Sequence, residues 1–410
     1  MRSSVPDANH GRSSPEPPAP KDTLRIAAGV MELHWNARFR YTPPNPRTYP
    51  WLWLWDSCFH ALIWDALGDA RAVDELASVF DWQHDDGFVP HMGYHADPPA
   101  ALVPWGRHGA STITQPPMYG HAIRMLAEHG HDVNRLHRPV AAGLRWLLAN
   151  RQDPGTGLVH VVHPWETGAD DTPRWARWQP QPFDRSVWGT TKAALVRSLV
   201  LSNGAAVANP AFAAIPASFN ALVAFNLIEA GEAAGDRALT EQGRALADRV
   251  DELLWDEDRR TWVDVLPTGE VSSRSATVES ALGVLVTTDH ERRRQLLDLV
   301  LSDDAYGGAF GPAGVRRDEP GFDPDGYWRG GAWPQITYLL GVSARRGGLA
   351  EHAERFATLL RRGAEASGFA EHWNPDTGAG SGAQPQSWTC LAAVPVADAR
   401  RPVAAQRPRS

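Results

Sequence analysis

The chain contains little cysteine and little lysine, and both shortages exclude classes of protein. Of its 410 residues only Cys58 and Cys390 are cysteines, too few for a disulfide framework, so we expect both to be small buried hydrophobic side chains. All but two of the 40 basic residues, Lys21 and Lys192, are arginines. The net charge is −8 and no basic run alternates with aromatic residues, which argues against a nucleic-acid partner.

Long apolar runs are also missing. No segment reaches the roughly 18 apolar residues that span a bilayer, so no membrane contact is expected. Residues 1–21 are rich in Ser and Pro and lack the apolar core of a signal peptide, which favours a disordered segment and a cytoplasmic location. Residues 400–410 are expected to form a flexible tail. The remainder, 22–399, is long enough for one domain with a single large core.

Between these ends, apolar residues recur at helical spacing in segments joined by short turns such as Gly68-Asp69 and Gly347-Gly348. No strand–helix alternation interrupts them, which favours an all-α fold, an (α/α)6 toroid. The spacing is too irregular for a solenoid of sequence repeats. The expected helices are 23–37, 56–67, 69–84, 116–130, 132–151, 185–203, 212–235, 237–256, 276–287, 289–302, 328–346, 349–367 and 386–397.

Long loops rich in Gly, Pro, Trp and His separate these helices. Loops of more than about 12–15 residues within a compact domain are usually functional. If helices alternate between an inner and an outer ring, alternate loops gather at one end of the toroid, and we expect the active site on that face. The loops in question are 38–55, 85–115, 152–184, 257–275, 303–327 and 368–385.

Two of these loops combine acidic residues with tryptophan. Residues 166–175 read ETGADDTPRW, and residues 368–378 read GFAEHWNPDTG. Cleavage of a glycosidic bond needs one carboxyl group that is protonated and a second that is ionised, to activate water or attack carbon. Tryptophan faces offer apolar surface to sugar rings and raise the pKa of a neighbouring carboxyl group. The two loops therefore predict a sugar-cleaving site.

The first of these segments resembles the Glu-Ser-Gly-x-Asp-x-Ser-x-Arg-Trp signature of the trehalase and family 63 glycoside hydrolases. The Asp of that signature is the general acid, which matches Asp170. Glu371-His-Trp-Asn-Pro resembles the later motif whose Glu is the general base, and residues 53–56 and 327–330 resemble motifs of the substrate pocket. Length and lack of extra domains bring the chain nearest to the bacterial mannosylglycerate and glucosylglycerate hydrolases of this group.

The resemblance implies an inverting α-glycosidase without cofactor or metal, acting on a small α-glycoside such as glucosylglycerate or mannosylglycerate. A trehalase, or an α-glucosidase acting on short oligosaccharides, is the alternative. The segment 216–220 reads PASFN and lacks the Asp of the family's usual Asp-Pro-x-Phe-Asn, which would fit a different aglycone. The side chains expected to bind substrate are Trp55, Asp56, His91, Tyr94, Gln115, Glu166, Arg174, Trp175, Tyr327, Trp328, Arg329, Gly330, Trp373 and Gln386.

Some of these residues have a second interpretation. Asp171 stands where the family usually has an uncharged residue, so it either holds the proton of Asp170 by like-charge repulsion or is itself the donor. Glu166 fits a supporting position behind the site as well as a contact with a sugar hydroxyl, and Arg174 fits a structural salt bridge as well as a sugar contact. Asp56 could cap the helix that follows it.

Other classes of protein fit the sequence less well. The His and Asp residues between 84 and 95 lack the ligand spacing of zinc, so no metal is expected. Asp85-Asp86 and the acidic pair at 170–171 lie among Gly and Pro rather than on the helices of an isoprenoid cyclase. A non-catalytic carbohydrate-binding protein remains the alternative of another class, although both motif carboxylates are present.

Overall fold

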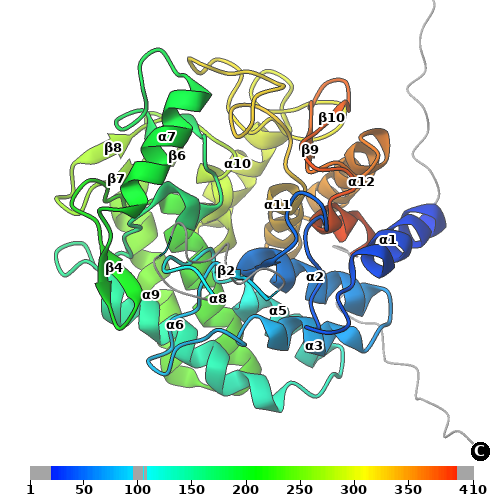
Figure 1. The fold of residues 1–410 in the computed structure, drawn as a ribbon. Coiled ribbons are helices and arrows are strands. Elements are labelled where there is room, and N and C mark those ends of the chain that lie inside the picture. Colours follow the sequence, from blue (N-terminus) through cyan, green and yellow to red (C-terminus); the bar gives the residue numbers. More distant parts are fainter. Residues whose placement is uncertain (1–19, 96–104, 106–108, 395–410) are drawn as a thin grey trace, which may run out of the picture.

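The computed structural model describes residues 20–95, 105 and 109–394. Its helices form two rings, with inner helices near the centre of the view in Figure 1 and outer helices towards its edge. This arrangement confirms the expected (α/α)6 toroid. The segments 1–21 and 400–410 lie outside the described residues, except that Pro20 and Lys21 begin the first helix rather than ending a disordered segment.

The inner ring closes on itself, because each of its segments packs against the next and the last returns to the first. In the part of the chain that the structure describes it comprises α2 (Leu54–Ala66), α5 (Tyr119–Glu128), α8 (Ala217–Ala234), η4 (Ser280–Leu285), α11 (Pro334–Arg346) and η5 (Ser387–Ala393). The segments η4 and η5 are 3₁₀ helices.

The outer ring covers the inner ring, and its helices alternate along the chain with the inner segments. They are α1 (Pro20–His34), α3 (Arg71–Ser78), α6 (His137–Arg151), α9 (Arg237–Leu254), α10 (His290–Leu301) and α12 (Ala350–Ala366). A further helix, α7 (Arg185–Val196), and the 3₁₀ turns η1 (Asn134–Leu136), η2 (Pro164–Thr167) and η3 (Pro173–Trp175) lie between ring members.

The two rings differ in sequence because they differ in burial. Inner helix α8 is apolar on nearly all sides and is buried along most of its length, whereas its outer partner α9 buries one stripe that includes Leu239, Leu246 and Val250. The side chain of Asp236 begins α9 by accepting the backbone N–H of Leu239 at 3.1 Å. Within the described residues, no helix is both long and apolar enough to cross a membrane.

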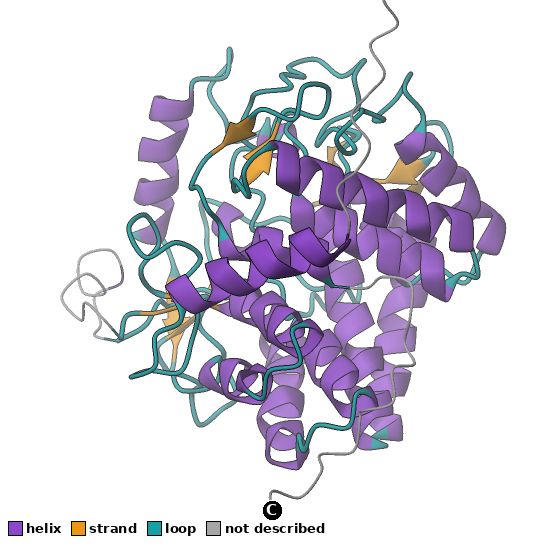
Figure 2. Ribbon diagram, turned by 90° about the vertical axis from the view of Figure 1, so that its right-hand side faces the viewer, coloured by secondary structure: helices purple, strands orange, loops and turns teal. Residues whose placement is uncertain are grey.

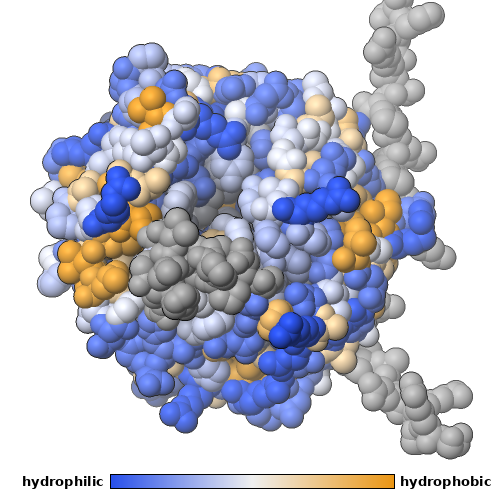
Figure 3. Space-filling view, viewed as in Figure 1, coloured by the Kyte–Doolittle hydropathy of each residue, from blue (hydrophilic) through white to orange (hydrophobic). Residues whose placement is uncertain are grey.

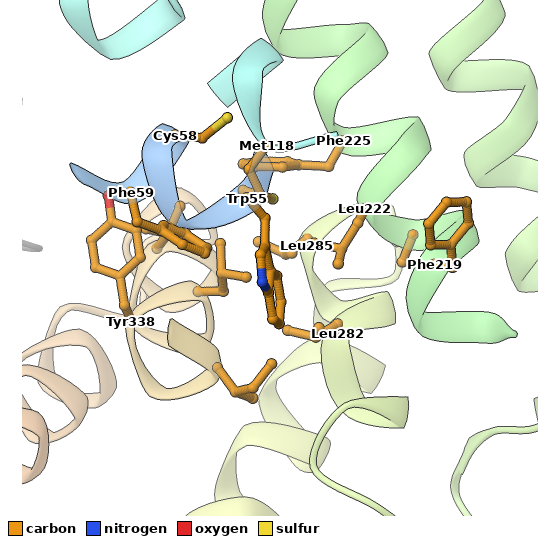
Figure 4. Packing of buried hydrophobic residues seen from close by; sticks show 14 of the residues in the cluster. Trp55, Cys58, Phe59, Met118, Phe219, Leu222, Phe225, Leu282, Leu285 and Tyr338 are labelled. Carbon is orange, nitrogen blue, oxygen red and sulfur yellow. The ribbon is translucent and has the colours of Figure 1, made fainter. Parts of the chain in front are cut away.

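Side chains of the inner ring fill the axis of the toroid. Figure 4 shows Trp55 of α2 pointing towards Leu282 of η4, with Leu222 of α8 close by. These residues belong to one large buried cluster. The two cysteines, Cys58 and Cys390, are both free and buried, as the sequence predicted.

Short antiparallel strands stiffen the loops. In Figure 2 the strands and loops lie mainly at the left and upper edges, while helices fill the rest of the body. Each sheet has two strands. The pairs are β1 (Leu52–Trp53) with β2 (Met92–Gly93), β3 (Val200–Ser202) with β4 (Ala205–Ala208), β5 (Trp255–Asp256) with β6 (Thr261–Trp262), β7 (Asp264–Val265) with β8 (Val271–Ser273), and β9 (His372–Trp373) with β10 (Gly380–Ser381).

The helix expected over 185–203 is wrong beyond residue 196. The chain leaves α7 there and forms the β3–β4 hairpin, whose turn residues Asn203 and Gly204 have φ values of 51° and 80°. A two-residue Asn-Gly loop with positive φ at both positions is the preferred connection of a hairpin. Local turn chemistry therefore ended the helix where apolar periodicity alone would have continued it.

Other expected helices also differ in extent from those of the structure. Helix α11 begins at Pro334 instead of 328, because Trp328 has a left-handed φ of 59° and proline suits the first helical turn. Of the helix expected over 69–84, only α3 is helical in the structure. The helices expected over 276–287 and 386–397 are the shorter 3₁₀ segments η4 and η5, and the part of the latter beyond residue 394 lies outside the described residues.

Gly120 provides a test of how tightly inner helices pack. A Cβ atom at this position of α5 would lie 2.3 Å from the backbone oxygen of Asn226 in α8. We expect Gly120→Ala to lower the free energy of unfolding by about 1–3 kcal/mol, because backbone in a packed helix cannot move aside. Urea denaturation measures the change.

The matched control is Gly29→Ala in α1, where the position is exposed and no atom lies within 4 Å of the added carbon. Alanine is the better helix former by roughly 1 kcal/mol, so this variant should be as stable as the natural protein or more so. Equal stability of the Gly120 and Gly29 variants would contradict close packing of α5 on α8.

Candidate active site

A pocket of about 580 Å³ opens on the loop face of the toroid. Figure 3 shows the surface hollowed near the centre of this face, beside α7. Among the residues predicted from the sequence, the pocket is lined by Trp55, Asp56, His91, Tyr94, Gln115, Asp170, Tyr327, Glu371 and Gln386. The fold thus brings the two predicted catalytic carboxyl groups, which are far apart in sequence, to one cavity.

The backbone around Asp170 is fixed by two indoles. Nε1 of Trp188, in α7, donates to the carbonyl oxygen of Asp170 at 2.9 Å, and Nε1 of Trp175 donates to that of Ala169 at 2.9 Å. Burial raises the pKa of the Asp170 carboxyl group to about 7, against the opposing effect of the positive charge of Lys192. A carboxyl group with this pKa is partly protonated at neutral pH and can donate a proton.

The carboxylate of Asp171, the next residue, forms ion pairs with two cationic side chains. Its Oδ1 lies 2.5 Å from Nζ of Lys192, and its Oδ2 lies 2.9 Å from Nε of Arg185. Only 2% of the Asp171 side chain is exposed, whereas Asp170 has no ion-pair partner among the described residues. The two adjacent carboxyl groups therefore have different environments, and that of Asp170 is suited to hold a proton.

Glu371 lies in the same pocket, just before β9, and its carboxyl group is held by hydrogen bonds. The phenol of Tyr49 donates to its two carboxyl oxygens at 3.2 and 3.4 Å, and the backbone N–H of Ala383 donates to Oε2 at 3.0 Å. Burial raises the pKa of Glu371 above its usual range, and these donors oppose the rise. Gly382, with φ of 78°, is required here because a Cβ atom would lie 2.3 Å from Oε2.

Several polar atoms at the pocket wall have no hydrogen-bond partner within the described part of the chain. They include the amide oxygens of Gln115 and Gln386 and the indole nitrogens of Trp51 and Trp53. Buried polar atoms are normally paired, so groups left free at a pocket wall suit a ligand with many hydroxyl groups. Burial also raises the pKa of Asp56 well above its usual range, helped by the charge of Glu371.

Glu166, predicted as a sugar contact, does not line the pocket. Its fully buried carboxylate forms a two-point ion pair with Arg151 of α6, at 2.8 and 2.9 Å. It also accepts the backbone N–H of Val162 at 2.7 Å and of Thr114 at 3.3 Å. Glu166 thus fixes the acidic loop from behind.

Arg174 forms a buried ion pair, which is the structural one of the two roles predicted for it. Its guanidinium pairs with Asp264 in β7 at 2.7 and 3.1 Å, and donates to the hydroxyl of Ser218 at 2.9 Å. Trp175 is fully buried behind the loop. The segment 216–220 likewise lies outside the pocket lining, so its departure from the family pattern does not alter the pocket wall directly.

Four further predicted contacts also lie behind the wall: Trp328, Arg329, Gly330 and Trp373. The ring of Trp328 stacks on Trp333 with centroids 3.7 Å apart. Arg329 donates to the backbone oxygen of Asp171 at 3.1 Å, and the indole of Trp373 donates to that of Phe310 at 2.7 Å. The side chains of Trp328, Arg329 and Trp373 are used in packing and hydrogen bonds, so they support the pocket without facing it.

Sequence reasoning missed Tyr49, Arg185 and Lys192 as wall residues. Arg185 and Lys192 are seven positions apart on α7, with Trp188 between them, so all three share one helix face. Lys192 is one of only two lysines in the chain, which was a signal available in the sequence. Over the described ranges, no group of three or more His, Cys, Asp or Glu side chains is placed to hold a metal ion.

The sequence and the fold resemble those of known proteins. A family model described as a mannosylglycerate hydrolase MGH1-like glycoside hydrolase domain matches residues 49–389. The mannosylglycerate hydrolase of Thermus thermophilus is 28% identical, over 89% of this chain and 98% of that protein. The glucosylglycerate hydrolase of Mycolicibacterium hassiacum is also 28% identical, over 93% of this chain and 99% of that protein.

A solved structure of such a relative has a similar fold. The family 63 mannosylglycerate hydrolase from Thermus thermophilus, in complex with Tris and D-glycerate, superimposes with a TM-score of 0.80 at 26% identity, covering 91% of this chain and 99% of that one. The (α/α)6 toroid, the acidic pocket on its loop face and the family model over residues 49–389 together make this protein a glycoside hydrolase. The chain belongs to the mannosylglycerate hydrolase MGH1-like family of these enzymes.

The buried ion pair behind the acidic loop yields a prediction of stability. Arg151→Met leaves the carboxylate of Glu166 buried without its cation, so we expect the free energy of unfolding to fall by about 3–5 kcal/mol. The control is Arg177→Met, which removes an exposed pair with Glu270 and should cost about 0–1 kcal/mol. Thermal and urea unfolding of both variants test this, and similar losses would contradict a supporting role for Glu166.

Proposed function

We propose that this enzyme hydrolyses a small α-glycoside of glyceric acid, glucosylglycerate or mannosylglycerate, with inversion at the anomeric carbon. The observation that carries the proposal is the pair formed by Asp170 and Glu371, which line the same pocket in different electrostatic environments. The volume of about 580 Å³ is in the range of pockets that enclose a small molecule. We also expect the enzyme to act in the cytoplasm.

In the proposed reaction, Asp170 donates its proton to the glycosidic oxygen as the bond to the anomeric carbon breaks. Glu371 takes a proton from a water molecule, which attacks that carbon from the other face of the ring. The phenol of Tyr49 and the N–H of Ala383 hold the carboxylate of Glu371 in one orientation. An inverting enzyme needs about 6.5–9.5 Å between its two carboxyl groups, which leaves room for the water.

The guanidinium of Arg185 supports the proposal that the aglycone carries a negative charge. Arg185 lines the pocket, about 65% of its side chain is exposed, and its Nε is the atom that pairs with Asp171. A guanidinium carries five N–H groups and binds carboxylates at two points, so Arg185 can take a substrate carboxylate in addition to Asp171. The relatives named above are hydrolases of mannosylglycerate and glucosylglycerate, and one was solved with D-glycerate.

The proposed roles of the two carboxyl groups are tested by Asp170→Asn and Glu371→Gln. Each should lower kcat by about 10²–10⁴-fold, the usual contribution of a general acid or base, with folding unchanged. Proton NMR of the natural enzyme with glucosylglycerate, mannosylglycerate, trehalose and maltose identifies the substrate. Release of the β-anomer first from an α-linked substrate is expected.

Asp303→Asn, at an exposed position remote from the pocket lining, is the matched control and should keep full activity. Release of the α-anomer would refute inversion by this pair. Turnover of trehalose or maltose in place of the glycerate glycosides would overturn the proposed substrate and favour the alternative, a trehalase or an α-glucosidase. Sugar binding without turnover of any panel member would favour a carbohydrate-binding protein.

The role of Arg185 is tested by Arg185→Met with two matched substrates, a glycosylglycerate and its glyceramide analogue. Loss of a charge-assisted hydrogen bond of about 1.5–3 kcal/mol should lower kcat/KM for the acid about 10- to 100-fold. The kcat/KM for the amide should fall much less. Because both substrates experience any effect of Arg185 on Asp171, the ratio of the two losses cancels that effect. Arg197→Met, exposed at the end of α7, is the control. Equal losses on both substrates would exclude a contact with the aglycone carboxylate.

A further inference from the structure

One face of α7 is built against the acidic loop. Arg185, Trp188 and Lys192 follow each other at spacings of three and four residues, so their side chains leave the helix on the same side. Trp188 holds the backbone oxygen of Asp170, while the two basic residues hold the carboxylate of Asp171. A single helix face thus contacts both members of the acidic pair.

Lys192 is unusual because it is buried. Only 9% of its side chain is exposed, and its ammonium lies 2.5 Å from Asp171 Oδ1. Burial of an ammonium group is costly unless an opposite charge compensates it. Without Asp171, this cation would have the carboxyl group of Asp170 as its neighbour in the same pocket wall.

The backbone of Asp171 is fixed as well as its side chain. Arg329 donates to its carbonyl oxygen at 3.1 Å, and the amide of Gln179 donates to the same oxygen at 3.4 Å. Asp171 therefore cannot easily turn towards the pocket to exchange roles with Asp170. Its carboxylate has four acceptor sites, and the two observed cations use one on each oxygen.

We propose that Asp171 is a positioning residue which, by pairing with Lys192 and Arg185, keeps both cations from the carboxyl group of Asp170, so that Asp170 enters each reaction cycle with its proton. The inference rests on the proposed role of Asp170 as general acid. It assigns a function to Asp171, next to the proposed general acid, and to the buried Lys192.

The charged and titratable groups around Asp170 are consistent with this role. Lys192 and Arg185 from α7 lower the pKa of Asp170, whereas Asp171 and Glu371 raise it. Tyr49 and Tyr327 face it from two other loops, and burial raises the pKa of both phenols, so they stay neutral over the working pH range. After burial, Lys192 and Asp171 have the largest effects on the pKa of Asp170, and these two effects have opposite signs.

The test is the pH dependence of kcat/KM for Asp171→Asn, Lys192→Met and the double variant, on glucosylglycerate and mannosylglycerate. The alkaline limb of this profile reports loss of the proton from the general acid. Asp171→Asn removes an anion and frees Lys192, so the limb should move down by about one pH unit, with about tenfold lower kcat/KM above it. Lys192→Met removes the cation, so the limb should move up.

The double variant should return the limb close to its natural position, because both charges are gone. A merely structural role would instead lower activity in all three variants without moving the limb in opposite directions. A limb that stays fixed in Asp171→Asn, or moves in the same direction in both single variants, overturns the proposal. The conservative Lys192→Arg keeps the charge and should keep the natural profile.

A readout without substrate separates this inference from the proposed function. The ¹³C carboxyl signal of Asp170, assigned by its loss in Asp170→Asn, should titrate at lower pH in Asp171→Asn and at higher pH in Lys192→Met. If these shifts occur while Asp170→Asn keeps full activity, the role of Asp170 as the acid fails and the electrostatic coupling stands. If Asp170→Asn is inactive and the signal does not shift, only the present inference fails.

Discussion

The structure depends on the closing of the inner ring, where η5 packs against α2. Ser387 donates its backbone N–H to the carbonyl oxygen of Pro44 at 2.9 Å, and its hydroxyl lies 2.8 Å from Nε2 of His60. The amide of Asn45 donates to the carbonyl oxygen of Pro385 at 2.9 Å. These buried contacts join the first helical pair to the last. Pro44 and Gln386, at these contacts, also line the pocket, so the closed ring forms part of the pocket wall.

The site depends on a second layer of buried charge. The Arg151–Glu166 and Arg174–Asp264 pairs are both fully enclosed and tie the acidic loop to α6 and to β7. A loop interrupted by Gly and Pro makes few backbone hydrogen bonds of its own, so side chains must fix it. Breaking such a pair leaves an unpaired charge in the interior, which is much more costly than loss of an exposed pair. Two charged residues of the motif, Glu166 and Arg174, therefore fix the acidic loop and do not line the pocket.

The sequence predicted the helices well where apolar periodicity was the dominant signal, as in α8 and α9. It failed where local backbone chemistry decided the outcome, at the Asn203-Gly204 turn after α7 and at the left-handed Trp328 before α11. In the site, motif membership identified Asp170 and Glu371 as pocket residues. It could not distinguish Gln115, which faces the cavity, from Glu166, which faces the core, because the direction of a side chain depends on packing partners that are remote in sequence.

What the sequence by itself determined was the class of fold, through the 3.6-residue period of its apolar positions, and the identity of the two acidic loops, through their spacing of carboxylates, indoles and turn residues. Only the tertiary structure shows that Asp170 and Asp171 have different environments. Lys192 and Arg185 come from a helix 14 to 21 residues away and pair with one carboxylate and not the other. Burial and Coulomb interactions depend on distance in space and on local dielectric, which a linear sequence does not contain.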